Sequence, residues 1–143
     1  MADPHDLDRF VTAQGGGTYK QALAELRRGR KTSHWMWFVF PQVAGLGSSP
    51  TAQRYAIASR AEAEAYLAHP VLGARLREAS EAVADAPGRS AEEVLGGIDA
   101  LKLRSSMTLF ALVAPDEPVF ARVLDRWYDG AQDPRTVQLL GRL

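Results

Sequence analysis

Apolar residues recur along most of the chain at intervals of three and four positions, which is the spacing of one face of an α-helix. The clearest such stripe consists of Tyr19, Ala22, Leu23 and Leu26. Thr18 and Gln21 have the spacing of a capping box at its start, and Gly29 follows it at a position where helices often end. We therefore predict a helix that Thr18 caps and that ends before Gly29.

Further helices are predicted wherever a start signal precedes an apolar face. Ser59 and Ser90 each have a glutamate three residues later, as in a capping box, and Asp99 is a suitable N-cap. His69, directly before Pro70, is interpreted as a capping residue at a helix junction. With these, the predicted helices start near Asp3, Pro50, Ser59, Pro70, Ser90, Asp99, Asp116 and Asp133.

Residues 35–40 are ambiguous, because an unbroken apolar run fits a buried strand as well as a buried helix. No second strand candidate of comparable quality exists, and a lone strand would leave its backbone hydrogen bonds unpaired. We therefore interpret these residues as a helical turn inside the core. A chain of 143 residues suits one domain. We predict an all-α fold, a compact single domain over residues 1–143 with about seven to nine short helices.

Composition and charge exclude several classes of protein. The chain has no cysteine and no histidines paired at metal-ligand spacing, so we expect neither a metal site nor a cofactor. Its 17 basic residues balance its 17 acidic ones, which argues against non-specific nucleic-acid binding. No apolar run approaches the roughly 20 residues of a membrane helix, and residues 1–8 lack the features of a secretory signal. We therefore expect a cytoplasmic protein; its oligomeric state stays open.

The segment Lys31–Gln42 places polar groups directly against aromatic rings. It combines a cation, hydroxyls and an imidazole with two of the three tryptophans: Lys31, Ser33, His34, Trp35 and Trp37. Aromatic walls with a few converging polar groups are typical of small-ligand pockets. The alternative is structural: Trp35 belongs to the core, His34 is a buried hydrogen-bonded histidine, and Lys31 only complements a helix C-terminus.

A glycine-containing loop is a second candidate for the same site. The loop Gly45-Leu46-Gly47 leads into the helix expected from Pro50. Backbone N–H groups in such a loop can bind a phosphate or carboxylate. Its spacing does not match a dinucleotide-binding motif, and most such loops are ordinary connections.

The helix predicted from Asp99 is the third candidate. Lys102 and Ser106 share a face with Asp99 at helical spacing, and Ser105 lies on another face. Hydroxyl side chains are unfavourable inside a helix, so Ser105 and Ser106 indicate close helix packing or a polar lining. The alternative for Asp99 and Lys102 is a solvated surface pair of little energy.

The residues in these three segments resemble those of a known protein family. The run Lys31–Gln42, Lys-x-Ser-His-Trp-Met-Trp-Phe-x-Phe-Pro-Gln, resembles the hallmark of a bacterial family called domain of unknown function 1810. The similarity covers about residues 7–127 and includes Tyr55-Ala56-Ile57 and the Asp99-x-x-Lys102 run. It implies a compact, mainly helical domain and supplies no catalytic residues. Some members are labelled calpastatin-like, but this globular chain does not resemble a disordered, repetitive calpain inhibitor.

The chain is also distantly similar to the NADAR group, which acts on ADP-ribose-type groups. The shared features are an imidazole beside aromatic residues and a downstream Asp-x-x-Lys followed by methionine, here His34, Asp99 and Lys102. This chain has Ser33-His34 where that group has a Glu-His pair. The difference argues against carrying over a hydrolase role.

The first functional hypothesis is a small-ligand domain, with catalysis left open, for an anion that carries a stackable ring, such as a nucleotide or ADP-ribose derivative. Lys31 and Lys102 would neutralise its charge. The catalytic roles would fall to His34, which transfers a proton, and to Asp99, which orients His34 or a ligand hydroxyl. The remaining ligand contacts would come from Ser33, Trp35, Trp37, Gln42, Gly45, Gly47, Ser105 and Ser106.

The second hypothesis is a non-catalytic interaction or structural domain. In that case the aromatic motif is core, and the polar residues cap helices. The two hypotheses differ in one observable property. The first requires that His34, Asp99 and Lys102 converge on an accessible hollow, and the second lets them point apart.

Overall fold

The computed structural model describes residues 3–143, and this part of the chain consists of helices and the loops that connect them. It contains ten helices, slightly more than we predicted: α1 Asp8–Ala13, α2 Thr18–Arg28, α3 Met36–Val39, α4 Pro50–Arg54, α5 Arg60–Ala68, α6 Leu72–Ala84, α7 Ala91–Leu95, α8 Gly97–Val113, α9 Pro118–Tyr128 and α10 Pro134–Gly141. An isolated backbone bridge pairs Val43 with Ile57. Within residues 3–143, no helix combines the length and the apolar character that crossing a membrane requires. The prediction of an all-α fold is confirmed.

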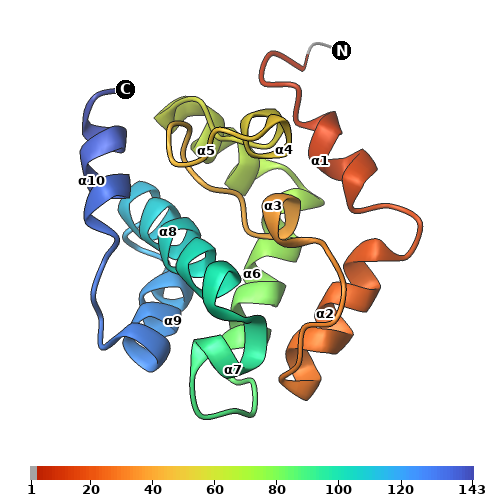
Figure 1. Cartoon of the computed structure of the whole chain (residues 1–143). Coiled ribbons are helices and arrows are strands. Elements are labelled where there is room, and N and C mark those ends of the chain that lie inside the picture. The colour runs from red at the N-terminus through yellow and green to blue at the C-terminus, as the bar shows by residue number, and fades with distance from the viewer. Residues whose placement is uncertain (1–2) are drawn as a thin grey trace.

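Two helices lie in the middle of the molecule, α6 and α8, with α1 and α2 on one side of them and α9 and α10 on the other (Figure 1). α8 packs against α5, α7, α9 and α10, and α6 packs against α2, α5 and α9. The short helix α3 contacts both α6 and α8. The aromatic segment around α3 is therefore held against both central helices.

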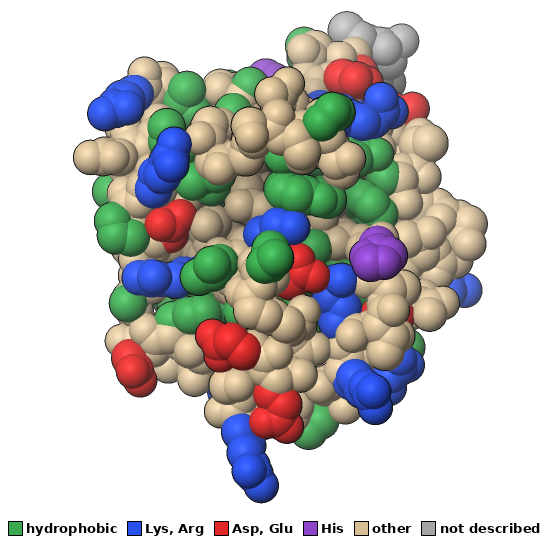
Figure 2. Space-filling view, in the orientation of Figure 1, with side chains coloured by type: hydrophobic (Ala, Val, Ile, Leu, Met, Phe, Trp, Pro, Cys, Tyr) green, Lys and Arg blue, Asp and Glu red, His purple; other side chains and the backbone are tan. Residues whose placement is uncertain are grey.

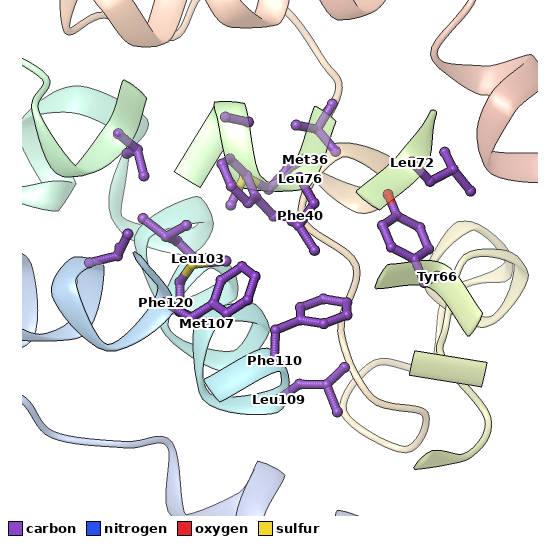
Figure 3. Close-up of a cluster of buried hydrophobic side chains, with 14 of the residues drawn as sticks. Met36, Phe40, Tyr66, Leu72, Leu76, Leu103, Met107, Leu109, Phe110 and Phe120 are labelled. Atoms are coloured by element: carbon purple, nitrogen blue, oxygen red, sulfur yellow. The ribbon is translucent and has the colours of Figure 1, made fainter. Parts of the chain in front are cut away.

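The core lies where these helices meet. Figure 3 shows side chains from α8 and α9, including Phe110 and Phe120, in one cluster with Tyr66 of α5 and with Phe40, which follows α3. Phe40 and Trp35 flank α3 and are buried, so the prediction of a buried helical turn is confirmed. Burying each such side chain contributes about 1.5–3 kcal/mol to stability, which ties α3 firmly to the central helices.

Several predicted helix starts are confirmed by their caps. The Ser59 hydroxyl accepts a hydrogen bond of 3.0 Å from the backbone N–H of Glu62, and Ser90 makes the equivalent bond at the start of α7. Nδ1 of His69 accepts a bond of 3.1 Å from the N–H of Leu72, so this histidine caps α6 as predicted. These caps are local in sequence, which is why they could be recognised before the fold was known.

Other predicted starts are wrong in detail. α2 begins at Thr18 itself, with Gly17 as its N-cap, so Thr18 is not the cap and the predicted capping box is not formed. Asp99 lies within the first turn of α8 and is not its N-cap, which leaves its carboxylate to meet other side chains. α1 begins at Asp8, later than predicted, and the Asp3 carboxylate accepts hydrogen bonds from the backbone just before and at that start.

Candidate functional site

A buried carboxylate fixes the segment that follows α2. Glu25 lies on the inward face of α2 and is 0% exposed. One of its oxygens accepts hydrogen bonds from the backbone N–H groups of Thr32 and Ser33 and from the indole N–H of Trp35, at 2.8–3.0 Å. The other oxygen accepts a bond of 2.6 Å from the Ser33 hydroxyl. Burial opposes ionisation, but these bonds outweigh it and hold the pKa of Glu25 far below its usual range.

Lys31 is turned inward beside this segment. Its backbone N–H donates a hydrogen bond of 2.8 Å to the carbonyl of Val94, which fixes the residue against the end of α7. Its Nζ donates a bond of 2.6 Å to the Ser33 carbonyl and lies 2.9 Å from Oδ2 of Asp99. The Lys31 side chain is only 8% exposed, and these partners offset the cost of burying its charge.

A second ammonium group reaches the same carboxylate from α8. Nζ of Lys102 lies 3.4 Å from Oδ1 of Asp99, whereas Nζ of Lys31 lies closest to Oδ2. It also lies 3.7 Å from the centre of the Trp37 ring, within the range of a cation–π interaction. Two positive charges and one negative charge leave the cluster with one net positive charge.

This cluster lines a hollow of about 200 Å³ that opens to solvent. His34, Trp37 and Thr51 form other parts of its wall; His34 is exposed and Trp37 is partly exposed. Figure 2 shows a histidine close to cationic and acidic side chains near the middle of this face of the molecule. The structure thus brings together His34, Asp99 and Lys102, the residues whose convergence separates our two hypotheses.

The glycine loop lines an adjoining hollow of about 160 Å³, which shares Trp37 with the first. Gln42, Gly45 and Gly47 all contribute to its wall. The loop does not offer a free helix N-terminus, because the Ser49 hydroxyl already accepts a hydrogen bond from the start of α4. Any contribution of this loop therefore comes from its shape and from Gln42.

The two tryptophans of the aromatic segment have different surroundings. Trp35 lines the first hollow, but it is only 1% exposed, and its indole N–H is bonded to Glu25. Trp37 is partly exposed and borders both hollows. Trp37 is therefore the ring on which a ligand could stack.

The hydroxyls of the three predicted site serines are either hydrogen-bonded to other side chains or buried. The Ser33 hydroxyl donates to Glu25, and the Ser105 hydroxyl donates a bond of 2.7 Å to Asp133. Ser106 is fully buried, and among the described residues its hydroxyl has no hydrogen-bond partner. None of these three serines lines either hollow.

Sequence reasoning missed Glu25, which positions Ser33 and Trp35. A signal was present, because Glu25 falls three residues after Ala22 on the apolar face of the helix predicted between Thr18 and Gly29. An acidic side chain on such a face requires hydrogen-bond donors in the core. Its donors lie in the next segment of the chain, and nothing in the local pattern identifies them.

The cluster provides chemical groups for binding an anion and exchanging a proton. Lysine ammonium groups attract phosphate or carboxylate, an indole face stacks on a planar ring, and an imidazole at the rim can donate or accept a proton. Within residues 3–143, no three histidine or carboxylate side chains are gathered so that they could hold a metal ion.

The fold and the site together define a small all-α protein with a cationic, indole-lined hollow. The chain belongs to the family described as "Protein of unknown function (DUF1810)", which matches residues 4–140 and confirms the resemblance. It is also similar to the crystal structure of a conserved hypothetical protein, Rv1873 from Mycobacterium tuberculosis. The two chains are 54% identical in sequence. That similarity has a TM-score of 0.94 and covers 97% of this chain and 99% of the other. No curated protein matches the chain.

Proposed function

We propose that the hollow beside α8 binds a small anionic ligand with a stackable ring, such as a nucleotide or an ADP-ribose-type compound. One observation carries this proposal: two ammonium groups, Lys31 and Lys102, meet on one carboxylate at the wall of a hollow that the partly exposed Trp37 also lines. A purely structural ion pair needs one cation for one anion. Here the second cation leaves a positive charge facing a hollow that opens to solvent.

The donors on the two ammonium groups support binding of an anion. Each lysine ammonium carries three N–H donors. Lys31 directs two of them at Ser33 and Asp99, and Lys102 lies at the long distance of 3.4 Å from Asp99. Donors therefore remain for phosphate oxygens, and hydrogen bonds between charged groups are stronger than those between neutral ones.

Catalysis is a narrower proposal that rests on the same hollow. The exposed His34, whose imidazole can transfer a proton, and Asp99 both line this hollow. A positioned imidazole and carboxylate are a common pair for general acid–base chemistry. His34 and Asp99 are thus the residues through which any reaction of the bound ligand would run.

A second candidate function, an interaction with another protein, has one observation in its favour. Ile98 and Leu101 in the first turns of α8 are strongly exposed, and Ile98 borders a shallow hollow that shares Asp99 and Lys102 with the first. Exposed apolar side chains at such a place suit a protein contact. They are only two, which makes the small-ligand proposal the better supported one.

The experiment is a calorimetric and thermal-shift titration with ADP-ribose, ADP, AMP and inorganic pyrophosphate. We expect at least one of them to bind, and Lys102→Ala to weaken it by about tenfold or more, because a charge-assisted hydrogen bond contributes about 1.5–3 kcal/mol. Lys20→Ala removes the same charge from the exposed face of α2 and serves as the matched control. If none of these compounds binds the wild-type chain, or if both variants bind equally well, the proposal is wrong and the protein-interaction candidate is favoured.

A further inference from the structure

The second hollow differs in character from the first. It is lined mainly by apolar groups, among them Val43, Leu46 and Ala52, together with the ring of Tyr55. It borders the same Trp37 ring that carries the Lys102 ammonium group. One ligand could therefore place a charged part in the first hollow and an uncharged part in the second.

Gln42 lines this mainly apolar hollow, and its side-chain amide lacks a full set of hydrogen-bond partners. It is only 9% exposed, and among the described residues its Nε2 has no hydrogen-bond partner. Its backbone is well fixed, since its carbonyl accepts a bond of 2.8 Å from Ile57, whose carbonyl in turn accepts one of 2.9 Å from Ala44. A buried amide donor without a partner is costly, and such groups in native proteins call for an explanation.

Two glycines shape the hollow that Gln42 lines. A Cβ on Gly47 would lie 2.7 Å from Cβ of Ala52 and 3.7 Å from a ring carbon of Trp37, so any side chain there would force the loop away. Gly45 has a φ of 101°, a conformation that other residues rarely adopt, and its carbonyl accepts a bond of 3.2 Å from Arg135 of α10. The loop is thus closely packed against Trp37 and braced from outside.

We propose that this second hollow receives the uncharged planar ring of the ligand, a nucleobase, and that the Gln42 amide hydrogen-bonds to its polar edge. An amide presents one acceptor and two donors, and its terminal torsion is soft, so it can match a ring edge that carries both kinds of group. Trp37 supplies the flat surface between the two hollows. This inference rests on the proposed function, because it assigns the ring and the charge of one ligand to separate subsites.

The first test uses the two halves of the ligand separately on ¹⁵N-labelled protein. Adenosine, guanosine and uridine carry a base without phosphate, and inorganic pyrophosphate carries charge without a ring. We expect one of the nucleosides to shift the side-chain amide signals of Gln42 and the indole N–H signal of Trp37, in the wild-type chain and in Lys102→Ala alike. Pyrophosphate should leave the Gln42 signals in place, and its binding should be lost in Lys102→Ala.

The second test uses Gln42→Met, which keeps the length of the side chain and removes its hydrogen bonds. We expect it to weaken ADP-ribose or nucleoside binding by about tenfold while pyrophosphate binds as before. The control is Gln138→Met, at an exposed position of α10.

The outcomes separate the two proposals. If no nucleoside moves the Gln42 and Trp37 signals, or if Gln42→Met binds the ring-bearing ligand as well as the wild-type chain does, the base subsite is wrong, even when pyrophosphate binds. If a nucleoside binds at Gln42 and no anion depends on Lys102, the base subsite stands and the anionic part of the proposed function is wrong.

Discussion

Two aspartates form polar clusters against the same helix, α8. The two clusters differ in whether all their hydrogen-bonding groups have partners within the protein. In the closed cluster, Asp133 accepts hydrogen bonds from the hydroxyls of Ser105 and Thr136 at 2.7 and 2.6 Å, and its own N–H donates to the Thr108 hydroxyl at 2.9 Å. In the open cluster, Asp99 receives two ammonium groups that border a hollow.

The comparison teaches that polarity alone does not mark a binding site. The closed cluster joins α8 to the start of α10 and has a purely structural explanation, because each of its polar atoms meets a partner within the protein. The open cluster has more positive charge than its carboxylate balances, and it faces solvent. Unused donors beside an accessible hollow are therefore the better criterion for a ligand site.

The largest effect is expected from Asp133→Ala in the closed cluster. The variant loses two charge-assisted hydrogen bonds and the bond from the N–H of Arg135 that caps α10. We expect a loss of about 3 kcal/mol in the free energy of unfolding, measured by urea denaturation, because each such bond contributes about 1–2 kcal/mol. Affinity for the ligands of the open cluster, measured on the folded variant, should not change; a parallel loss of affinity would contradict the separation of the two clusters.

Acid provides a further check on the closed cluster. Burial opposes ionisation of Asp133, but the hydrogen bonds from Thr136 and Ser105 outweigh it and hold its pKa below the ordinary value of 3.8. A depressed pKa stabilises the fold above the pKa of the unfolded chain, and this contribution is lost as the pH falls below about 4. The urea midpoint of the wild-type chain should therefore drop more steeply in this range than that of Asp133→Ala. Equal slopes would show that Asp133 is not the group responsible.

A smaller and qualitatively different effect is expected from Asp99→Asn in the open cluster. Removing the charge leaves Lys31 and Lys102 without their counter-ion, which should lower the free energy of unfolding by about 1–2 kcal/mol. The same change raises the local net charge from one to two, so pyrophosphate should bind several-fold more tightly. Calorimetry measures both the sign and the size of this change. Weaker pyrophosphate binding would mean that the hollow is not organised for anions.

Much of the fold could be predicted because its signals are local. The caps at Ser59 and Ser90 lie within three residues of the groups they satisfy, and the helical turn at residues 36–39 follows from its apolar run and the lack of a strand partner. The predicted start of α8 is wrong, because aspartate is a common N-cap residue but Asp99 forms ion pairs with lysines instead. Local patterns identify elements well, and they identify the partners of a side chain only when those partners are near in sequence.

The candidate site was predictable in part for the same reason. Lys31 and His34 adjoin aromatic residues in the sequence, which indicates a site there, and in the structure both line the hollow with Lys102. Ser105 could not be separated from them, because its partner Asp133 reaches it only through the packing of α10 on α8. Glu25 was missed because its partners lie in a segment whose path is fixed by the carboxylate itself.

The smallest effect is expected within the adjacent pair Ser105 and Ser106, where only the first substitution should destabilise the chain. Ser105→Ala removes a hydrogen bond to Asp133, so it should destabilise the chain by about 1 kcal/mol. Ser106→Ala removes a fully buried hydroxyl that has no partner among residues 3–143, so it should be neutral or stabilising by up to about 1 kcal/mol. Urea denaturation of the two variants side by side measures the difference. If Ser106→Ala were the more destabilising of the two, its hydroxyl would have a partner, and our explanation of the difference between the two serines would be wrong.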